Sequence, residues 1–465
     1  MPLYNGSVSD HAQLTPALDA HARAPEATPA APPPVGPLPS RSLHPAAWGV
    51  LVLPFGIAVG YLQVAVPYVL RLRGLDMAVI GGIVATANMP HALKFLWAPA
   101  LDAGWPRKRW YLVMVALTAL TLAITSLIPP DNSVRFGPVG MLALYTLFLT
   151  LAQAAVATSS SAILGIMASV VPEAEKGRAS GWQTAGNLAG TSIGGAAVAW
   201  LIGHTSPIAT GAIVAALCLA CTIPAFFIHE PVPETHPVLK AMKLLAVDLW
   251  KTVKSRPGWT GMIICLSPVG TGAMLNLFSA LALDYSSDPT TRENMVLYAT
   301  GVASGLISAA GALVGGYLAD RMNRRLAYVV FGFITALCAL AMIVAPTNAT
   351  TFTVGCLAYS FANGLCYAAF YAFVFEMVGK GHGATTKLAL FISASNQAIN
   401  YVTWLDGKSY DWGKALWAPH AWAGRTGMLG MDAASTFVGI AVLGVMMVVV
   451  KRMGSEKTAS EAVPA

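Results

Sequence analysis

Charge is the property that this sequence has least of. Only 11% of its 465 residues are Asp, Glu, Lys or Arg, whereas 56% are hydrophobic. A soluble domain carries about 25% charged residues, so most of this chain must contact something other than water. The net charge of +7 does not indicate a nucleic-acid partner, because the basic residues lie in short loops between long uncharged runs. The composition therefore predicts an integral membrane protein.

Motifs of catalysis and cofactor binding are missing as well. No Gly-rich phosphate loop follows a strand, no Walker motif is present, and no Ser/His/Asp arrangement has a plausible scaffold. The six cysteines all lie in apolar runs, which favours packing over a disulfide framework or a zinc site. We expect no enzymatic activity, no cofactor and no bound metal.

Long apolar runs are what the sequence does contain. A helix needs about 20 apolar residues to cross the hydrocarbon core of a bilayer. Twelve stretches meet this need, near 47–69, 78–100, 110–129, 138–168, 179–203, 208–228, 258–284, 294–318, 326–346, 352–377, 386–405 and 431–450. The expected fold is an all-α integral membrane protein with about twelve transmembrane helices. The expected inner loops hold seventeen Lys and Arg residues and the outer loops seven, which places both termini in the cytoplasm.

An internal repeat divides the chain into two halves. The stretch from Gly74 to Tyr111 has an apolar run, an acid and a basic cluster, and the same plan returns from Arg292 to Val329. Two such units indicate two six-helix bundles related by a repeat. The predicted domains are a disordered Ala/Pro-rich tail without a secretory signal, a first bundle, a cytoplasmic connector, a second bundle and a C-terminal tail. They span 1–46, 47–228, 229–257, 258–452 and 453–465. Within the connector, Val238–Lys254 has the pattern of a basic amphipathic helix on the inner leaflet.

The repeated motif carries a family resemblance. The run from Gly316 to Arg325, GYLADRMNRR, looks like the signature of the major facilitator superfamily. The run from Leu93 to Pro99, LKFLWAP, is similar to the branch with AmpG-type muropeptide permeases, acetyl-coenzyme A transporters and some siderophore permeases. Unlike muropeptide permeases, the chain has no acid after Gln153 in the expected fourth span, so that family's proton-linked acids are not carried over.

The resemblance also implies a gate. In this superfamily, acid–base clusters at the inner ends of the second and eighth spans bridge the two halves at the cytoplasmic side. We expect this gating role for the residues of both clusters, Asp102, Arg107, Arg109, Asp320, Arg321, Arg324 and Arg325.

Polar residues inside the expected spans are candidates for a solute or proton site, because such groups are costly in lipid. Asn88, His91 and Lys94 share a helix face. His91 could be an anion site, a proton carrier or a satisfied packing residue, and Lys94 could line a cavity or snorkel to the inner boundary. Ser267 to Gly272 puts a proline and two glycines in an apolar run, which favours a broken helix that lines a cavity.

Further candidates come from the fifth, seventh, tenth and eleventh expected spans. They are Gln183, Asn187, Asn276, Asn363, Tyr367, Tyr371, Asn396, Gln397 and Asn400. The tyrosines could stack on a ligand or could simply pack in the core. Asp284 and Glu376, near span ends, could pair with a base or help to carry protons.

These features predict a secondary-active transporter that imports a polar solute by alternating access. The solute could be anionic, and the expected coupling ion is the proton. A muropeptide-like sugar-peptide and a siderophore are both compatible with the resemblance. The expected setting is the plasma (inner) membrane, with the bilayer around a multi-pass monomer. The alternatives are a non-transporting receptor or scaffold, and, last, a membrane enzyme. A scaffold has no reason to keep amides in lipid-depth helices.

Overall fold

The computed structural model describes residues 43–97, 101, 105–130, 135–136, 139–172, 175–230, 238–378 and 384–461. Residues 1–42 of the predicted tail and the gating candidate Asp102 lie outside the described residues. The described part is helical except for connecting segments and one pair of two-residue antiparallel strands, β1 (Arg135–Phe136) and β2 (Val139–Gly140).

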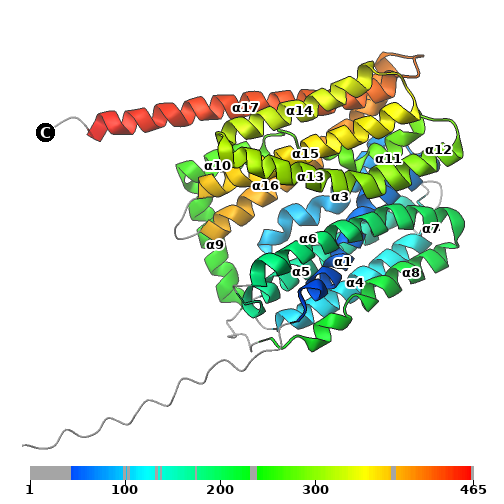
Figure 1. Ribbon diagram of the computed structural model, residues 1–465, viewed down its shortest axis with the longest axis horizontal. Helices are drawn as coiled ribbons and strands as arrows, with labels where there is room; N and C mark the ends of the chain where they lie inside the picture. Colours follow the sequence, from blue (N-terminus) through cyan, green and yellow to red (C-terminus); the bar gives the residue numbers. More distant parts are fainter. Residues whose placement is uncertain are drawn as a thin grey trace, which may run out of the picture. The chain divides into compact units, whose positions relative to one another are not determined.

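The residues up to Ile228, here called the N-terminal half, form a set of long helices (Figure 1). The first runs from Pro45 to Leu72 as α1 (Pro45–Gly60), the π-helical turn η1 (Tyr61–Ala65) and α2 (Val66–Leu72). The others are α3 (Met77–Leu93) with the 3-10 turn η2 (Lys94–Leu96), α4 (Arg107–Leu127), α5 (Met141–Val170), α6 (Lys176–Ser192) continued by η5 (Ile193–Ala197) and α7 (Val198–His204), and α8 (Pro207–Ala220) with η6 (Ile223–Phe227).

The residues from Arg256 onward, here called the C-terminal half, follow the connector helix α9 (Val238–Lys254). Its elements are α10 (Arg256–Leu266), η7 (Ala273–Asn276), α11 (Phe278–Leu281), η8 (Ala282–Asp284), α12 (Pro289–Asn294) continued by η9 (Met295–Ala303) and α13 (Ser304–Arg321), α14 (Arg324–Val344), α15 (Ala349–Val378), α16 (Ala384–Leu416) and α17 (Ala423–Glu461). Helix α9 has the bounds expected for the amphipathic segment.

Among the described residues, nine helices are long and apolar enough to cross a membrane by length and composition. The expected spans near 78–100, 258–284 and 386–405 are not among them. Helix α3 has 17 residues, the segment after α10 is broken, and α16 carries many polar groups. Their shortfall has a physical cause. Helix α16 contacts α3, α10 and η7, and amides of α3 and η7 form hydrogen bonds with polar groups of α16 inside the protein.

The expected break in the seventh span is present. Helix α10 ends at Leu266, and the backbone at Gly270 and Gly272 has φ values of 52° and 70°. Only glycine adopts this left-handed region without strain, so a continuous helix cannot pass through the segment.

The expected spans near 386–405 and 431–450 leave an outer loop from Asp406 to Gly430 between them, and this prediction is wrong for most of its length. Helix α16 continues to Leu416 and α17 begins at Ala423. The two helices pack closely in this region, where a Cβ at Gly413 would lie 2.4 Å from the carbonyl oxygen of Ala423. Interhelix contact therefore outweighs the polar composition that suggested a loop. As a result, Asp406 lies in a helix and is fully buried.

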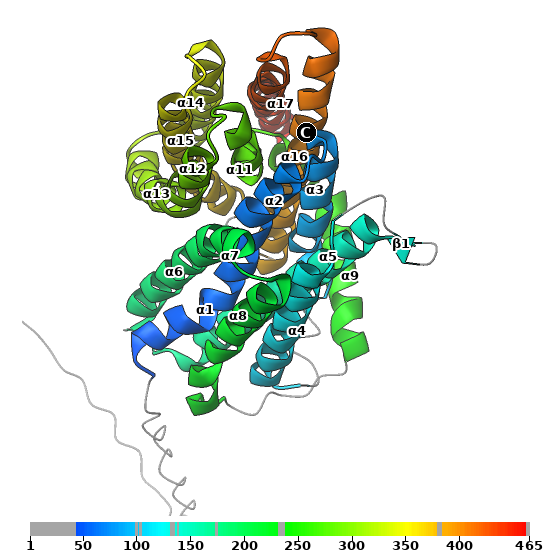
Figure 2. The same ribbon diagram turned by 90° about the vertical axis from the view of Figure 1, so that its right-hand side faces the viewer.

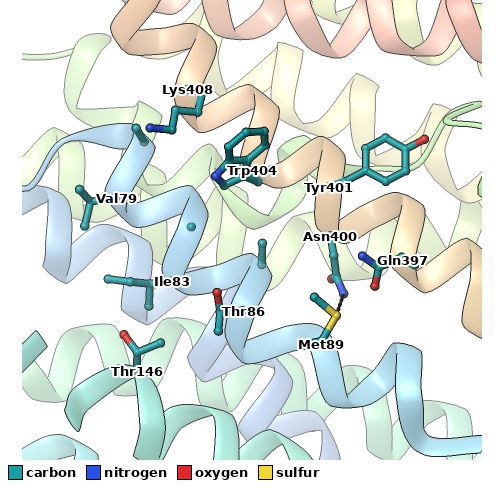
Figure 3. A pocket seen from close by; sticks show the side chains of 13 residues that line it. Val79, Ile83, Thr86, Met89, Thr146, Gln397, Asn400, Tyr401, Trp404 and Lys408 are labelled. Atoms are coloured by element: carbon teal, nitrogen blue, oxygen red, sulfur yellow. Dashed lines mark hydrogen bonds between the residues drawn. The ribbon is translucent and has the colours of Figure 1, made fainter. Parts of the chain in front are cut away.

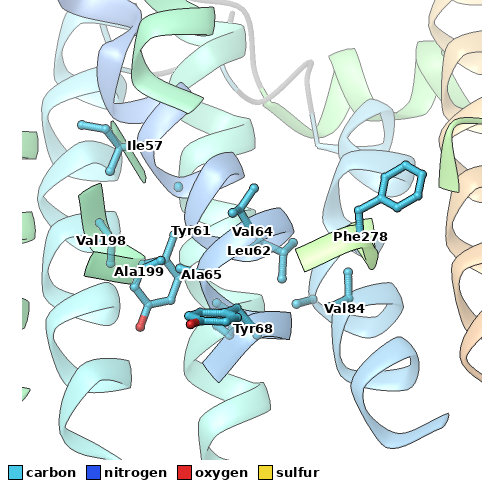
Figure 4. Packing of buried hydrophobic residues seen from close by; sticks show 14 of the residues in the cluster. Ile57, Tyr61, Leu62, Val64, Ala65, Tyr68, Val84, Val198, Ala199 and Phe278 are labelled. Atoms are coloured by element: carbon cyan, nitrogen blue, oxygen red, sulfur yellow. The ribbon is translucent and has the colours of Figure 1, made fainter. Parts of the chain in front are cut away.

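The two halves are joined along α3 and α16, and again between η5 and η9 (Figures 1 and 2). A single cluster of buried apolar side chains contains residues of both halves. Figure 4 shows part of it, with Leu62 and Val84 of the N-terminal half near Phe278 of α11. The halves are thus in apolar contact around α2, α3 and α11.

Candidate solute site between the two halves

Amide side chains connect α3 with α16. Asn88 on α3 donates from its Nδ2 to Oδ1 of Asn400 on α16, at 2.8 Å. Asn396, one turn earlier, donates to the backbone carbonyl of His91 at 3.1 Å. Unpaired amides at this depth are costly, so each pair favours a joined arrangement of the halves. Three residues predicted as site candidates, Asn88, Asn396 and Asn400, are brought together here.

A cavity of about 530 Å³ adjoins this contact. Figure 3 shows side chains of α3, α5 and α16 around it. Its polar lining groups are Thr86, Thr146, Gln397, Asn400, Tyr401 and Lys408. Its larger apolar lining groups are Val79, Ile83, Met89 and Trp404.

The chemistry of this cavity suits a solute with sugar and acid groups. Amides and hydroxyls exchange hydrogen bonds with hydroxyl-rich molecules, and the indole of Trp404 offers a flat apolar face. Lys408, whose ammonium lies 6.0 Å from the centre of the Trp404 ring, supplies a positive charge. The sequence analysis did not single out Lys408 and Trp404, although Asn400, Trp404 and Lys408 follow one another at steps of four residues, which was a usable signal.

The broken segment after α10 is tied to its neighbours through its polar groups. Asn363 on α15 donates to the carbonyl of Gly270 at 3.2 Å, and Tyr401 donates to the carbonyl of Leu266 at 2.6 Å. Asn276 donates to the hydroxyl of Thr403 at 3.0 Å. Asn276 and Asn363 are buried, and their hydrogen bonds hold the broken segment against α16 and α15. The sequence predicted that this broken helix lines a cavity. The pocket beside Gly270 is small, with a volume of about 10 Å³.

Tyr367 and Tyr371, the two predicted stacking candidates, lie on α15, on the side of the helix that faces the small pocket beside Gly270. Tyr367 is exposed and borders the pocket, and its ring centroid is 5.1 Å from that of Tyr371 in an edge-to-face arrangement. An exposed aromatic edge of this kind is available to a ligand, so Tyr367 stays a candidate.

His91 lies inside the N-terminal half. Its Nε2 is 3.0 Å from Oε1 of Gln153 on α5, and its ring meets Phe55 of α1 edge-on with centroids 5.9 Å apart. Gln153 in turn donates to the carbonyl of Ala58 at 2.8 Å. This chain of contacts matches the packing alternative for His91. Lys94 begins η2 at the end of α3 and is half-buried.

Gln183 and Asn187 lie on α6, which packs against α1. Gln183 is half-buried and accepts from Thr184, whereas Oδ1 of Asn187 is buried without a hydrogen-bond partner among the described residues. Neither residue borders the cavity beside α16. The structure therefore does not gather the fifth-span amides with those of α3 and α16.

The predicted gating residues make these contacts. Oδ1 of Asp320 is 3.9 Å from Arg324, and Arg321 lies 3.9 Å over the ring of Tyr317. Arg325 lies 5.9 Å over Phe373. Their role as an inner gate stays a prediction.

At the first of the two clusters, Arg107 donates to the carbonyl of Gly165 at 3.1 Å, and Arg109 is exposed. Glu230 accepts from the backbone N–H groups of Arg107 and Lys108 at 3.1 and 2.9 Å, which ties the connector to the start of α4. The sequence reading missed this cap. Glu376 lies outside the described side chains.

A second polar cluster, of which the sequence analysis had singled out only Asp284, joins α2, η8 and α16. Arg71 and Asp284 form a salt bridge with 3.6 Å between Nη2 and Oδ1. Tyr410 accepts from Arg71 and donates to Asp284, each at 2.7 Å. Asp411 accepts from the backbone N–H of Ala78 in the first turn of α3, at 3.0 Å. Of the two alternatives for Asp284, the structure shows the pairing with a base.

We predict that His91→Ala will lower stability rather than transport. The change leaves Oε1 of Gln153 without its His91 contact and opens a space between α1, α3 and α5, at a cost of about 2–4 kcal/mol. Thermal unfolding in detergent should shift down by several degrees, while uptake per folded molecule stays within about twofold. His91→Gln keeps a donor and should recover part of the loss. Uptake that vanishes at full folded yield would place His91 in the transport route instead.

Comparison with known proteins identifies the family. Residues 43–405 match the model of the Major Facilitator Superfamily, which is most of the chain, so the protein belongs to this family of multi-pass membrane transporters. Transporters of this family are not, in general, enzymes. The chain is 23% identical over 364 residues to the anhydromuropeptide permease of Escherichia coli strain K12, across 75% of this chain and 70% of the relative.

Solved structures of transporters share the fold. The nucleoside transporter NupG in a mutant form gives a TM-score of 0.67 at 15% identity, over 86% of this chain and 98% of that chain. A bacterial homologue of the human lysosomal transporter Spinster, inward-facing and occupied, gives 0.64 at 13% identity, over 90% and 98%. A D-xylose–proton symporter gives 0.63 at 15% identity, over 86% and 95%.

Proposed function

We propose that the protein imports a sugar-peptide of the anhydromuropeptide kind across the plasma (inner) membrane by alternating access, coupled to protons. In this proposal twelve spans form two six-helix bundles, 47–228 and 258–452, with both termini in the cytoplasm. The protein acts as a monomer, and α9 lies on the inner leaflet.

The observation that carries the proposal is the meeting of amide groups from the two halves. Asn88 and Asn400 pair across α3 and α16, and the cavity next to them adds Gln397, Trp404 and Lys408. A sugar-peptide presents hydroxyls, amides, apolar sugar faces and carboxylates, and this lining has a counterpart for each. The likeness to a permease for anhydromuropeptides supports the same class of solute.

Uptake into proteoliposomes tests the proposal. We expect labelled anhydromuropeptide to accumulate when the outside is made acidic, and unlabelled anhydromuropeptide to compete, whereas the free peptide and a ferric siderophore compete weakly. Lys408→Met and Gln397→Leu should raise the half-saturating solute concentration about tenfold, as expected for one lost polar contact each of about 1.4 kcal/mol. Accumulation of the siderophore but not of the sugar-peptide would contradict the proposed solute. Equal uptake by empty liposomes would contradict transport itself.

A further inference from the structure

A polar stripe runs along one face of α16. Asn396, Asn400, Thr403, Asp406 and Tyr410 follow one another at steps of three or four residues, the spacing that keeps side chains on one side of a helix. Four of the five have partners described above, in α3, in η7 or around Arg71. Asp406 is the exception.

Asp406 is a carboxyl group buried inside the protein. Its exposed fraction is 0%, and neither carboxyl oxygen has a donor among the described residues. It lies ten residues before the end of α16, or about 15 Å at 1.5 Å per residue. The group is therefore well inside the helical part of the protein.

The neighbours of Asp406 supply a second carboxyl and a phenol. Asp432 on α17 interacts with it electrostatically and is 1% exposed. Tyr359 on α15 donates to both carboxyl oxygens of Asp432, at 3.1 and 3.0 Å, and interacts with Asp406 as well. Three helices thus contribute one titratable group each.

No cation neutralises this pair within the described part of the chain, where neither carboxyl takes part in a salt bridge. Arg425, on α17 with Asp432, donates to Thr347 and lies 5.1 Å over the ring of Tyr285. Arg71 is paired with Asp284. Of the other elements packed against α16, α3 follows Asp76 and contributes His91, whose ring is bound to Gln153. The turn η2 contributes Lys94, and α9 contributes lysines beside the start of α10.

A bare carboxylate in such surroundings costs several kcal/mol, and two together cost more. Asp406 therefore holds a proton in the arrangement observed. The cost disappears if water reaches the polar face of α16, which requires the contacts of that face with α2, α3 and η8 to separate.

We propose that Asp406, with Asp432 and Tyr359 beside it, is the proton-binding site that couples solute movement to the proton gradient. The inference rests on the proposed proton-coupled import. Asp406 takes up a proton from the outer solution when the stripe is open at Tyr410, retains it while the stripe is closed, and releases it to the cytoplasm once the halves open on the inner side. Thr403, three residues before Asp406, is bonded to Asn276, and Asn400 is bonded to Asn88 at the solute cavity. Asp406 and the solute-binding residue Asn400 thus lie on the same helix, so gain or loss of the proton on Asp406 can change the position of the residues that bind the solute.

Asp406→Asn tests the site, because it removes the titration and keeps the shape. We expect accumulation driven by a pH gradient to fall at least tenfold and its pH dependence to vanish. Exchange of labelled for unlabelled solute without a gradient should stay within about threefold of wild type. Asp288→Asn, which changes an exposed carboxyl that caps α12, should behave as wild type. An Asp406→Asn protein that still accumulates solute with wild-type pH dependence overturns the inference.

A measurement on the unmodified protein covers the case in which the variant does not fold. Dicyclohexylcarbodiimide reacts with protonated carboxyl groups in apolar surroundings, and mass spectrometry should find it on Asp406 and block accumulation. Absence of label on Asp406, or accumulation that follows a sodium gradient instead, overturns the proton site. If wild type moves no solute while Asp406 is labelled, the proposed function fails and the protonated site stands.

Discussion

Gly407→Val will abolish transport while the protein still folds. Helices α3 and α16 are in backbone contact at this point, and a Cβ at Gly407 would lie 2.5 Å from the carbonyl oxygen of Met77 and 3.1 Å from Cα of Gly81. The first distance is too short for a real Cβ atom and the second is unusually tight, and the atoms met are backbone that cannot rotate away. The helices must separate. The arrangement in which α3 and α16 are in contact, here called the closed arrangement (Figure 2), then becomes inaccessible.

We expect uptake below about 5% of wild type, because a clash of a few kcal/mol moves a two-state equilibrium by two orders of magnitude or more. Hydrogen exchange should become faster at the start of α3 and in the last turns of α16. The matched control is Gly430→Val on α17, since a Cβ there meets no atom within 4 Å. A Gly407→Val protein with normal uptake would show that this contact is not needed in the transport cycle.

Arg71→Gln or Asp284→Asn will shift the same equilibrium toward separated helices. The two side chains are 14% and 18% exposed, so water screens their attraction only in part. Loss of either charge leaves the other with Tyr410 as a neutral partner and without its counter-ion. We expect a cost of about 2–3 kcal/mol to the closed arrangement, equivalent to a shift of about 30-fold to 150-fold.

A double-mutant cycle separates the pair from its surroundings. Arg71→Gln with Asp284→Asn should lose less than the sum of the single changes, and the exchange Arg71→Asp with Asp284→Arg should recover part of the uptake. Hydrogen exchange at the start of α3 gives the conformational readout, and initial uptake rates give the functional one. Strictly additive losses in both measurements would mean that Arg71 and Asp284 are not energetically coupled and do not hold α2 against η8.

The sequence by itself determined where most of the helices lie. The apolar run from Leu51 to Val66 must be a helix in lipid, because no water is present to satisfy its backbone. The interruption from Ser267 to Gly272 is equally local, since proline and left-handed glycines end a helix whatever surrounds them. Family membership also followed from a local motif, GYLADRMNRR, and the match over residues 43–405 confirms it.

Only the tertiary structure decided what each polar group meets. Asn88 and Asn400 are 312 residues apart in sequence, and Arg71 and Tyr410 are 339 apart. Such pairs depend on how the two halves dock, a property that hydropathy and helical spacing do not contain. Packing within each half places His91 beside Gln153 and encloses Asp406, a residue that the sequence had predicted to lie in a loop. Hydropathy sets where a chain enters the membrane, whereas packing sets which of its few polar atoms remain without partners.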